Sequence, residues 1–115
     1  MHGYQIKTLW EKMFEIHGLI QTQNWEQLKR VARITDETIE DAKFEIEEYP
    51  GEMTECPFDE FTDAVRLGDF DGSKVDCCFA DFWFDGERSD LSMEFDAEFK
   101  GRELKRVYIN HIHVF

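Results

Sequence analysis

The sequence has 115 residues, 42% of them apolar and eleven of them Phe, which suffices for one domain with its own hydrophobic core. Its formal net charge of -13 argues against nucleic acid or an anionic membrane surface as a partner, because both are bound through Lys and Arg. No apolar run approaches the roughly 20 residues of a membrane helix, no signal peptide is recognisable, and the three cysteines form no CxxC motif. We therefore expect a cytoplasmic protein without a cofactor, whose partner is a basic protein.

The first part of the chain is predicted to be helical. Apolar residues three or four apart favour a helix over about residues 4–17, which Gly18 would end. Asn24 is a suitable cap for a short second helix, and Thr35 for a third helix over residues 36–48. A Pro-Gly pair directly after the third helix prevents its continuation.

The central strand is predicted over residues 75–84. Side chains alternate between the two faces of a strand, and here both faces are mostly apolar. In a regular strand Val75, Cys77, Phe79 and Trp83 would share one face. The next run, residues 91–99, alternates apolar and polar residues, as a strand with one buried and one exposed face does. The Asp-Gly pair between the two runs favours a hairpin turn.

Two further strands complete the predicted sheet. Residues 61–67 alternate and would form its first strand, with a short helix as the alternative, and residues 104–115 would form its last. The chain is thus one domain over residues 1–115, mainly helical over 1–49 and mainly antiparallel sheet over 61–115. This order predicts an α+β fold, with the helices packed on one face of a curved antiparallel sheet of about four strands.

Most of the negative charge lies between Asp36 and Asp71, where fourteen Asp and Glu face only Lys43 and Arg66. A solvated face is the ordinary explanation of such a run. On the third helix, however, like charges four residues apart cost about 0.2–0.5 kcal/mol per pair, and Glu in the last turn opposes the helix dipole by about 0.3–1 kcal/mol. Carboxylates that repeatedly destabilise one helix, without a compensating interaction nearby, indicate a binding surface. The predicted surface consists of Glu37, Asp41, Glu45, Glu48, Glu52, Glu55, Asp59, Glu60 and Asp63.

Asp81 interrupts an apolar face of the central strand and so has to be paired, neutral or near the open end of the sheet. Pairing with Arg88 or Arg106 is the explanation we favour. The alternative is an acid/base pocket in the sheet concavity. The candidate residues of that pocket are Asp81, Trp83, Tyr108 and His113.

Other chemistry has little support in the sequence. His111 and His113 project to one face of the last strand, a workable spacing for two metal ligands, but packing beneath the helices is the commoner role. There is no Ser-His-Asp spacing, no glycine-rich phosphate loop and no recognisable nucleophilic cysteine. We accordingly predict no catalytic residue and no metal site.

Two stretches resemble an uncharacterised family of small bacterial proteins. They are residues 81–93, in which a Trp-containing strand leads into Gly-Glu-Arg-Ser-Asp-Leu, and the terminal Asn-His-Ile-His-Val-Phe of residues 110–115. Tyr-Pro-Gly at 49–51 and Pro-Phe-Asp-Glu at 57–60 also fit its pattern. The resemblance covers about residues 20–115 and implies an NTF2-like or cystatin-like fold. It also implies a likeness to immunity proteins that are paired with bacterial toxins.

Charge and resemblance together predict a function without turnover. The chain would be an immunity protein that binds and neutralises a cognate, Lys- and Arg-rich bacterial toxin of nuclease type, as in contact-dependent growth inhibition. The acidic surface would make the contact and compete with the phosphates that such a toxin binds. The alternative is a small-molecule-binding or enzymatic NTF2-like domain that uses the pocket in the sheet concavity.

Overall fold

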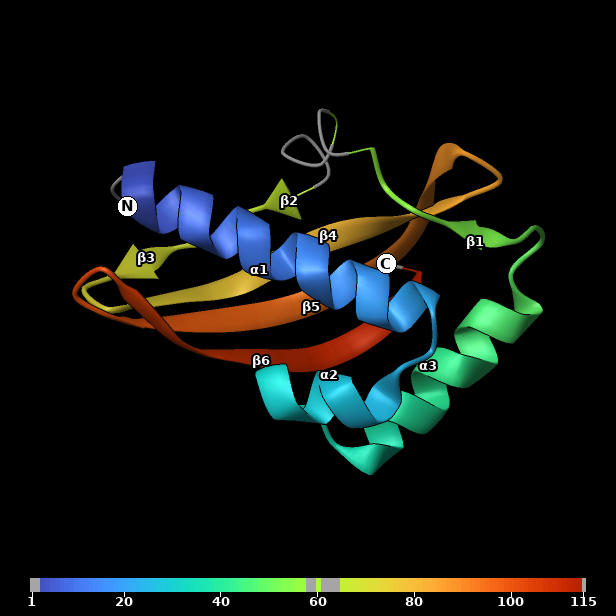
Figure 1. Cartoon of the computed structure of the whole chain (residues 1–115), viewed down its shortest axis with the longest axis horizontal. Helices are drawn as coiled ribbons and strands as arrows, with labels where there is room; N and C mark the ends of the chain where they lie inside the picture. The colour runs from blue at the N-terminus through green and yellow to red at the C-terminus, as the bar shows by residue number, and fades with distance from the viewer. Residues whose placement is uncertain (1–2, 58–59, 61–64, 115) are drawn as a thin grey trace.

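The computed structural model describes residues 3–57, 60 and 65–114 as three helices packed on a curved antiparallel sheet (Figure 1). The helices are α1 (Gly3–Gln21), α2 (Trp25–Val31) and α3 (Asp36–Glu48). The strands are β1 (Met53–Thr54), β2 (Val65–Arg66), β3 (Phe70–Asp71), β4 (Lys74–Phe84), β5 (Glu87–Lys100) and β6 (Glu103–Val114). The predicted α+β fold is thereby confirmed, and the arrangement is consistent with an NTF2-like fold.

The sheet is organised around β4, as the sequence predicted. Its main path is β1-β4-β5-β6, and the short strands β2 and β3 also pair with β4. The number of strands therefore exceeds the predicted four, because β1 and β3 are two-residue strands that periodicity does not reveal. Of the strand predicted at 61–67, the structure shows β2, and residues 61–64 lie outside the described residues.

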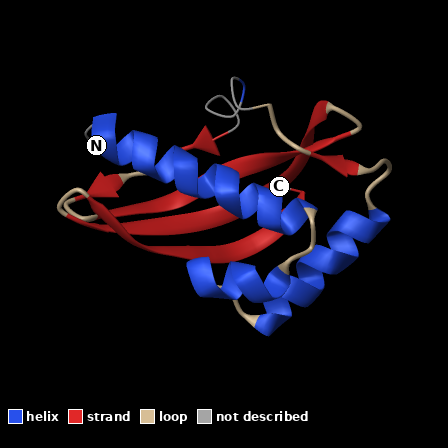
Figure 2. Ribbon diagram, viewed as in Figure 1, coloured by secondary structure: helices blue, strands red, loops and turns tan. Residues whose placement is uncertain are grey.

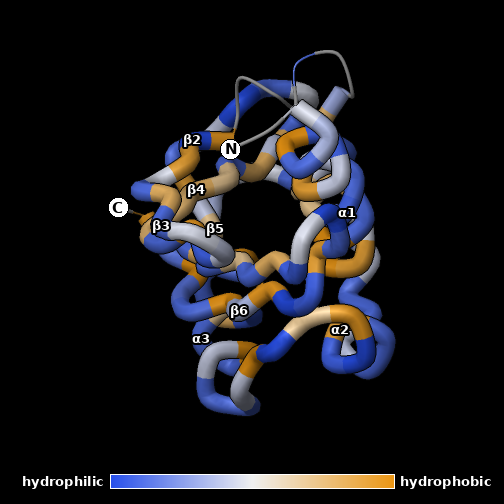
Figure 3. Tube along the Cα trace, turned by 90° about the vertical axis from the view of Figure 1, so that its left-hand side faces the viewer, coloured by the Kyte–Doolittle hydropathy of each residue, from blue (hydrophilic) through white to orange (hydrophobic). Residues whose placement is uncertain are grey.

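Helix α1 crosses the concave face of the sheet, whereas α2 and α3 lie beside β6 (Figure 2). The α1 side chains Leu9, Met13, Ile16 and Ile20 are fully buried in the core that the helix shares with the strands. Each such side chain stabilises the fold by about 1.5–3 kcal/mol through removal of apolar surface from water. Buried and less buried positions largely alternate in the second half of β5 and in β6, so one face of these strands carries the core. Hydrophobic and hydrophilic residues both occur along the sheet (Figure 3).

The predicted end of the first helix at Gly18 is wrong. The helix continues to Gln21, and the backbone N–H and the hydroxyl of Thr22 both donate to the Gly18 carbonyl oxygen, at 3.1 and 2.9 Å. Continuation buries Ile20, which a helix ending at Gly18 would leave outside the core. The predicted caps of α2 and α3 are confirmed, since Asn24 Oδ1 and Thr35 Oγ1 accept backbone N–H groups of their helices.

A β-bulge corrects the predicted faces of β4. Val75 lies opposite Ala97 and Cys78 opposite Phe95, so Val75 and Cys78 share the buried face although they are three residues apart. Cys77 has a φ of +55°, is exposed and donates its N–H to Asp96 Oδ1 at 2.9 Å. The prediction that Val75 and Cys77 share a face is therefore wrong, because a bulge resets the period of two.

Candidate functional site

The acidic residues of α3 form one continuous face. Glu37, Asp41, Glu45 and Glu48 recur at helical spacing, opposite the buried Ile39 and Ala42. Within the described part of the chain, no Lys or Arg nitrogen comes within 4.0 Å of these four carboxylates. The neighbouring bases are engaged elsewhere, Lys43 with Glu40 and Lys29 with Asp36. The negative charge of this face is thus open to solvent and to a partner.

Phe44 lies in the middle of this acidic face and is 62% exposed. It is one helical turn from both Asp41 and Glu48, and is the most exposed of the large apolar residues described. An exposed aromatic ring surrounded by charge is typical of an interface anchor, because aromatic residues contribute most when a partner covers them. Phe44 was not among the residues predicted from the sequence, although its spacing from Asp41 and Glu48 on the helix was a signal for it. We call Glu37, Asp41, Phe44, Glu45 and Glu48 the α3 face.

A groove runs between the α3 face and the end of β6. Its cavity has a volume of about 190 Å³ and is lined by Asp41, Phe44 and Glu45 on the helix and by His111 and His113 on the strand. The two histidine rings lie 5.8 Å apart, as expected for side chains on one face. Among the described residues no group of three or more His, Cys, Asp or Glu side chains is arranged to hold a metal ion. The groove thus combines carboxylate, aromatic and imidazole side chains.

The acidic surface continues from α3 onto the start of β5. Glu45, Glu48, Asp90 and the exposed Val114 line a second, open hollow of about 360 Å³. Asp90 accepts a hydrogen bond of 2.7 Å from the Tyr49 hydroxyl, which raises the pKa of that hydroxyl. This hollow joins the groove through the shared Glu45.

Ser89 stabilises the start of β5 after the hairpin. Its hydroxyl accepts from the Leu91 N–H at 3.2 Å and donates to the Phe82 carbonyl oxygen at 2.7 Å. The Asp90 carboxylate is turned toward Tyr49 and is available at the surface.

The predicted acidic loop after α3 does not join the α3 face as one patch. Glu55 lies beside α1, at the small cavity lined by His17, Cys56 and Trp83. Glu60 lines a different hollow, with Glu87 and Arg88. Glu52 is exposed at the start of the segment that leads to β1, and Asp59 and Asp63 lie outside the described residues. The structure thus brings together the helical members of the predicted surface.

Asp81 is held in a double ion pair. Its side chain is 9% exposed, and its carboxylate accepts from Arg66 at 2.8 and 3.1 Å and from Arg88 at 2.7 and 2.8 Å. Burial alone would raise the pKa of Asp81, but the hydrogen bonds from the two arginines outweigh it and the pKa lies below its usual value. Pairing with Arg88 is as predicted, whereas Arg66 was not singled out and Arg106 lies beside Tyr108 instead.

The alternative pocket does not assemble from its four predicted residues. Asp81 and His113 both pair with Ser92 of β5, but Tyr108 pairs with Asp96. Four residues of strand separate these positions, or about 13 Å. Trp83 is 3% exposed, and the cavity next to it beneath α1 measures about 40 Å³. That is room for water, whereas ligand sites commonly need about 300 Å³ or more.

The fold and the site define a small α+β domain, three helices on a curved sheet, that presents an acidic helix face with an exposed aromatic ring. Residues 17–115 match the family described as Domain of unknown function (DUF7668), and the chain belongs to that family. No curated protein and no solved structure was found to match the chain. None of the helices described has the length and apolar character needed to cross a membrane.

Proposed function

We propose that this protein is an immunity protein, which neutralises a cognate basic protein toxin by binding it on the α3 face. The observation that carries the proposal is the set of four carboxylates on one face of α3, next to an exposed phenylalanine, that make no ion pair with a Lys or Arg of the described residues. The net charge of -13 adds a long-range attraction for a Lys- and Arg-rich partner.

The α3 face combines the two contributions that a tight protein inhibitor needs. Its carboxylates accelerate encounter with a basic surface and exclude acidic competitors. Phe44 supplies apolar area that slows dissociation once it is covered. Docked Lys or Arg side chains also relieve the repulsion between Glu37, Asp41 and Glu45 along the helix. A toxin that cleaves nucleic acid fits best, because the cations that would hold its substrate's phosphates are those that carboxylates can occupy.

The alternative function, a small-molecule-binding or enzymatic NTF2-like domain, has less support. Its key carboxylate, Asp81, is occupied by two guanidinium groups, and the space beneath α1 is too small for a substrate. In the α3 face, in contrast, Glu37, Asp41, Phe44 and Glu48 are exposed to solvent and Glu45 is half-buried.

The test uses the products of genes adjacent to the gene of this protein. Each is co-expressed with the chain, and a toxic product that the chain neutralises is purified for stopped-flow measurement of its association rate. The triple variant Asp41→Lys/Glu45→Lys/Glu48→Lys should lower that rate at least about tenfold at low salt and flatten its salt dependence. The control Glu11→Lys/Asp69→Lys/Glu103→Lys changes the net charge equally at exposed positions outside the α3 face. It should retain most of the wild-type rate.

Phe44→Ala provides an independent check. Because the ring is 62% exposed, the variant should unfold at the wild-type temperature, but the complex should dissociate about tenfold faster or more. An association rate unchanged by the triple reversal, together with unchanged dissociation of Phe44→Ala, would reject the α3 face as the docking surface.

A further inference from the structure

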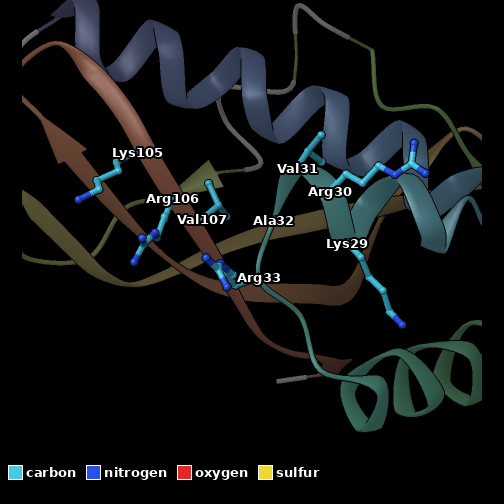
Figure 4. A pocket seen from close by; sticks show the side chains of 8 residues that line it. All are labelled: Lys29, Arg30, Val31, Ala32, Arg33, Lys105, Arg106 and Val107. Atoms are coloured by element: carbon cyan, nitrogen blue, oxygen red, sulfur yellow. The ribbon is translucent and has the colours of Figure 1, made fainter.

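A second concave surface of opposite charge lies at the other end of β6. It is a groove of about 330 Å³ between the end of α2 and the first half of β6 (Figure 4). Its basic side chains are Lys29, Arg30, Arg33, Lys105 and Arg106. They are five of the 13 Lys and Arg in a chain with twice as many acidic residues. We call these five residues the basic groove.

The fold itself brings these distant cations together. After α2 the backbone becomes extended, and Arg33 forms a parallel bridge to β6. The Arg33 N–H donates to the Val107 carbonyl oxygen at 2.7 Å, and the Ile109 N–H donates to the Arg33 carbonyl oxygen at 2.8 Å. Arg33 thereby lines the same groove as Arg106, which stands two residues before its bridge partner Tyr108 (Figure 4). Sequence spacing alone gives no sign of this contact.

The charge of the basic groove is only partly compensated from within. Lys29 is paired with Asp36, and Arg106 is engaged by Tyr108 with Glu98 nearby. In the described part of the chain, no carboxylate lies within 4.0 Å of Arg30, Arg33 or Lys105.

Local structure explains some of these cations but not all. Lys29 and Arg30 complement the dipole at the end of α2, and a lysine on the edge strand β6 discourages strand addition. Neither reason applies to Arg33, which the backbone bridge places in the same groove as Lys105 and Arg106. A bound anion would offset the repulsion among these like charges.

We propose that the basic groove binds a small anion that carries two or more phosphate groups. Planar guanidinium groups match phosphate oxygens in pairs, and several cations around one hollow favour a multiply charged ligand. The volume of about 330 Å³ lies within the range of small-molecule sites, and basic side chains dominate the lining. A long nucleic acid is disfavoured, since beyond the groove it would meet a chain whose net charge is -13.

The probe is sodium tripolyphosphate, titrated into the full-length protein at low ionic strength by isothermal calorimetry. The wild type should bind it with one-to-one stoichiometry and more tightly than orthophosphate. Arg33→Gln/Lys105→Gln/Arg106→Gln should weaken binding at least about tenfold, because it removes charge-assisted hydrogen bonds. The control Lys7→Gln/Lys43→Gln/Lys100→Gln removes the same charge at exposed positions elsewhere and should change affinity less than about twofold, as expected for screened distant charges.

Three results would overturn the proposal. The first is no binding by the wild type, and the second is equal loss in the control, which would show generic attraction. The third is tighter binding of single-stranded oligonucleotides that grows with their length, which would identify a nucleic-acid surface instead. If the triple variant fails to fold, the same titration is made with Arg106→Gln alone, which changes an exposed strand position and should also weaken tripolyphosphate binding. The triple reversal of the α3 face should still bind tripolyphosphate, so this outcome is separate from that of the toxin experiment.

Discussion

His17 should make the stability of the protein depend on pH between 7 and 5. The side chain is buried in α1 and its ring stacks on Phe82 with centroids 4.3 Å apart. Burial lowers the pKa of His17 to about 3, although the nearby Asp81 carboxylate works in the opposite direction. In the unfolded chain an ordinary histidine has a pKa of about 6.5. Between these two values the unfolded state binds the additional proton, so stability falls as pH falls.

The size of the effect follows from these two pKa values. At pH 7 about a quarter of unfolded chains carry the proton on this histidine, and at pH 5 nearly all of them do. Integration over this window gives a loss of about 2 kcal/mol in the free energy of unfolding. The lowered pKa values of Asp36 and Asp81 act below this range, because those carboxylates are ionised in both states above about pH 5.

Urea denaturation at pH 7, 6 and 5 measures this loss directly. His17→Phe keeps an aromatic ring against Phe82 but cannot be protonated, so its stability should be nearly constant over the window. Any packing cost of the larger ring cancels, because each variant is compared with itself across pH. His111→Gln, at an exposed position, should retain the wild-type dependence. A loss of about 2 kcal/mol that persists in His17→Phe would refute the assignment to the buried imidazole.

Two further predictions concern the stability of the fold, one for the ion pairs of Asp81 and one for two glycine positions. Removal of one arginine from Asp81, as Arg66→Gln or Arg88→Gln, should lower the free energy of unfolding by about 1 kcal/mol at pH 7. The double variant should lose more than the sum of the two single losses, because it leaves a buried carboxylate unpaired. Chemical denaturation of the wild type and the three variants measures this coupling, and strictly additive losses would contradict the prediction. Gly68→Ala should cost about 2–4 kcal/mol, since its Cβ would lie 1.7 Å from the Asp76 carbonyl oxygen. Gly18→Ala, with open space around it, should instead stabilise α1 by about 0.5–1 kcal/mol, and chemical denaturation of both glycine variants measures the two changes.

Local signals in the sequence were sufficient for several elements. Asn24 and Thr35 cap α2 and α3 because their side-chain oxygens reach backbone N–H groups three residues on, a contact that depends only on neighbours. The Asp85-Gly86 pair forms the hairpin for a similarly local reason, since both residues adopt the positive φ that a two-residue turn demands. The acidic stripe of α3 followed from helical spacing alone.

Features that depend on distant contacts were not predictable in this way. The bulge at Cys77 is held by Asp96 of the next strand, and Arg66 reaches Asp81 only because β2 pairs with β4. The basic groove depends on the bridge between Arg33 and β6. Each contact joins residues about 15 or more apart in sequence, so no local pattern announces it.

Strand β6 serves both proposed surfaces, and its edge determines how they can be recognised. Lys105 and Arg106 line the basic groove, whereas His111 and His113 line the groove beside the α3 face. Between them Arg33 occupies the free edge of the strand with two backbone hydrogen bonds. A partner therefore cannot add a strand at that point, as partners of some proteins do at an exposed sheet edge. Recognition at either surface then depends on side-chain charge and on Phe44, so charge-changing variants separate the two surfaces while leaving the sheet intact.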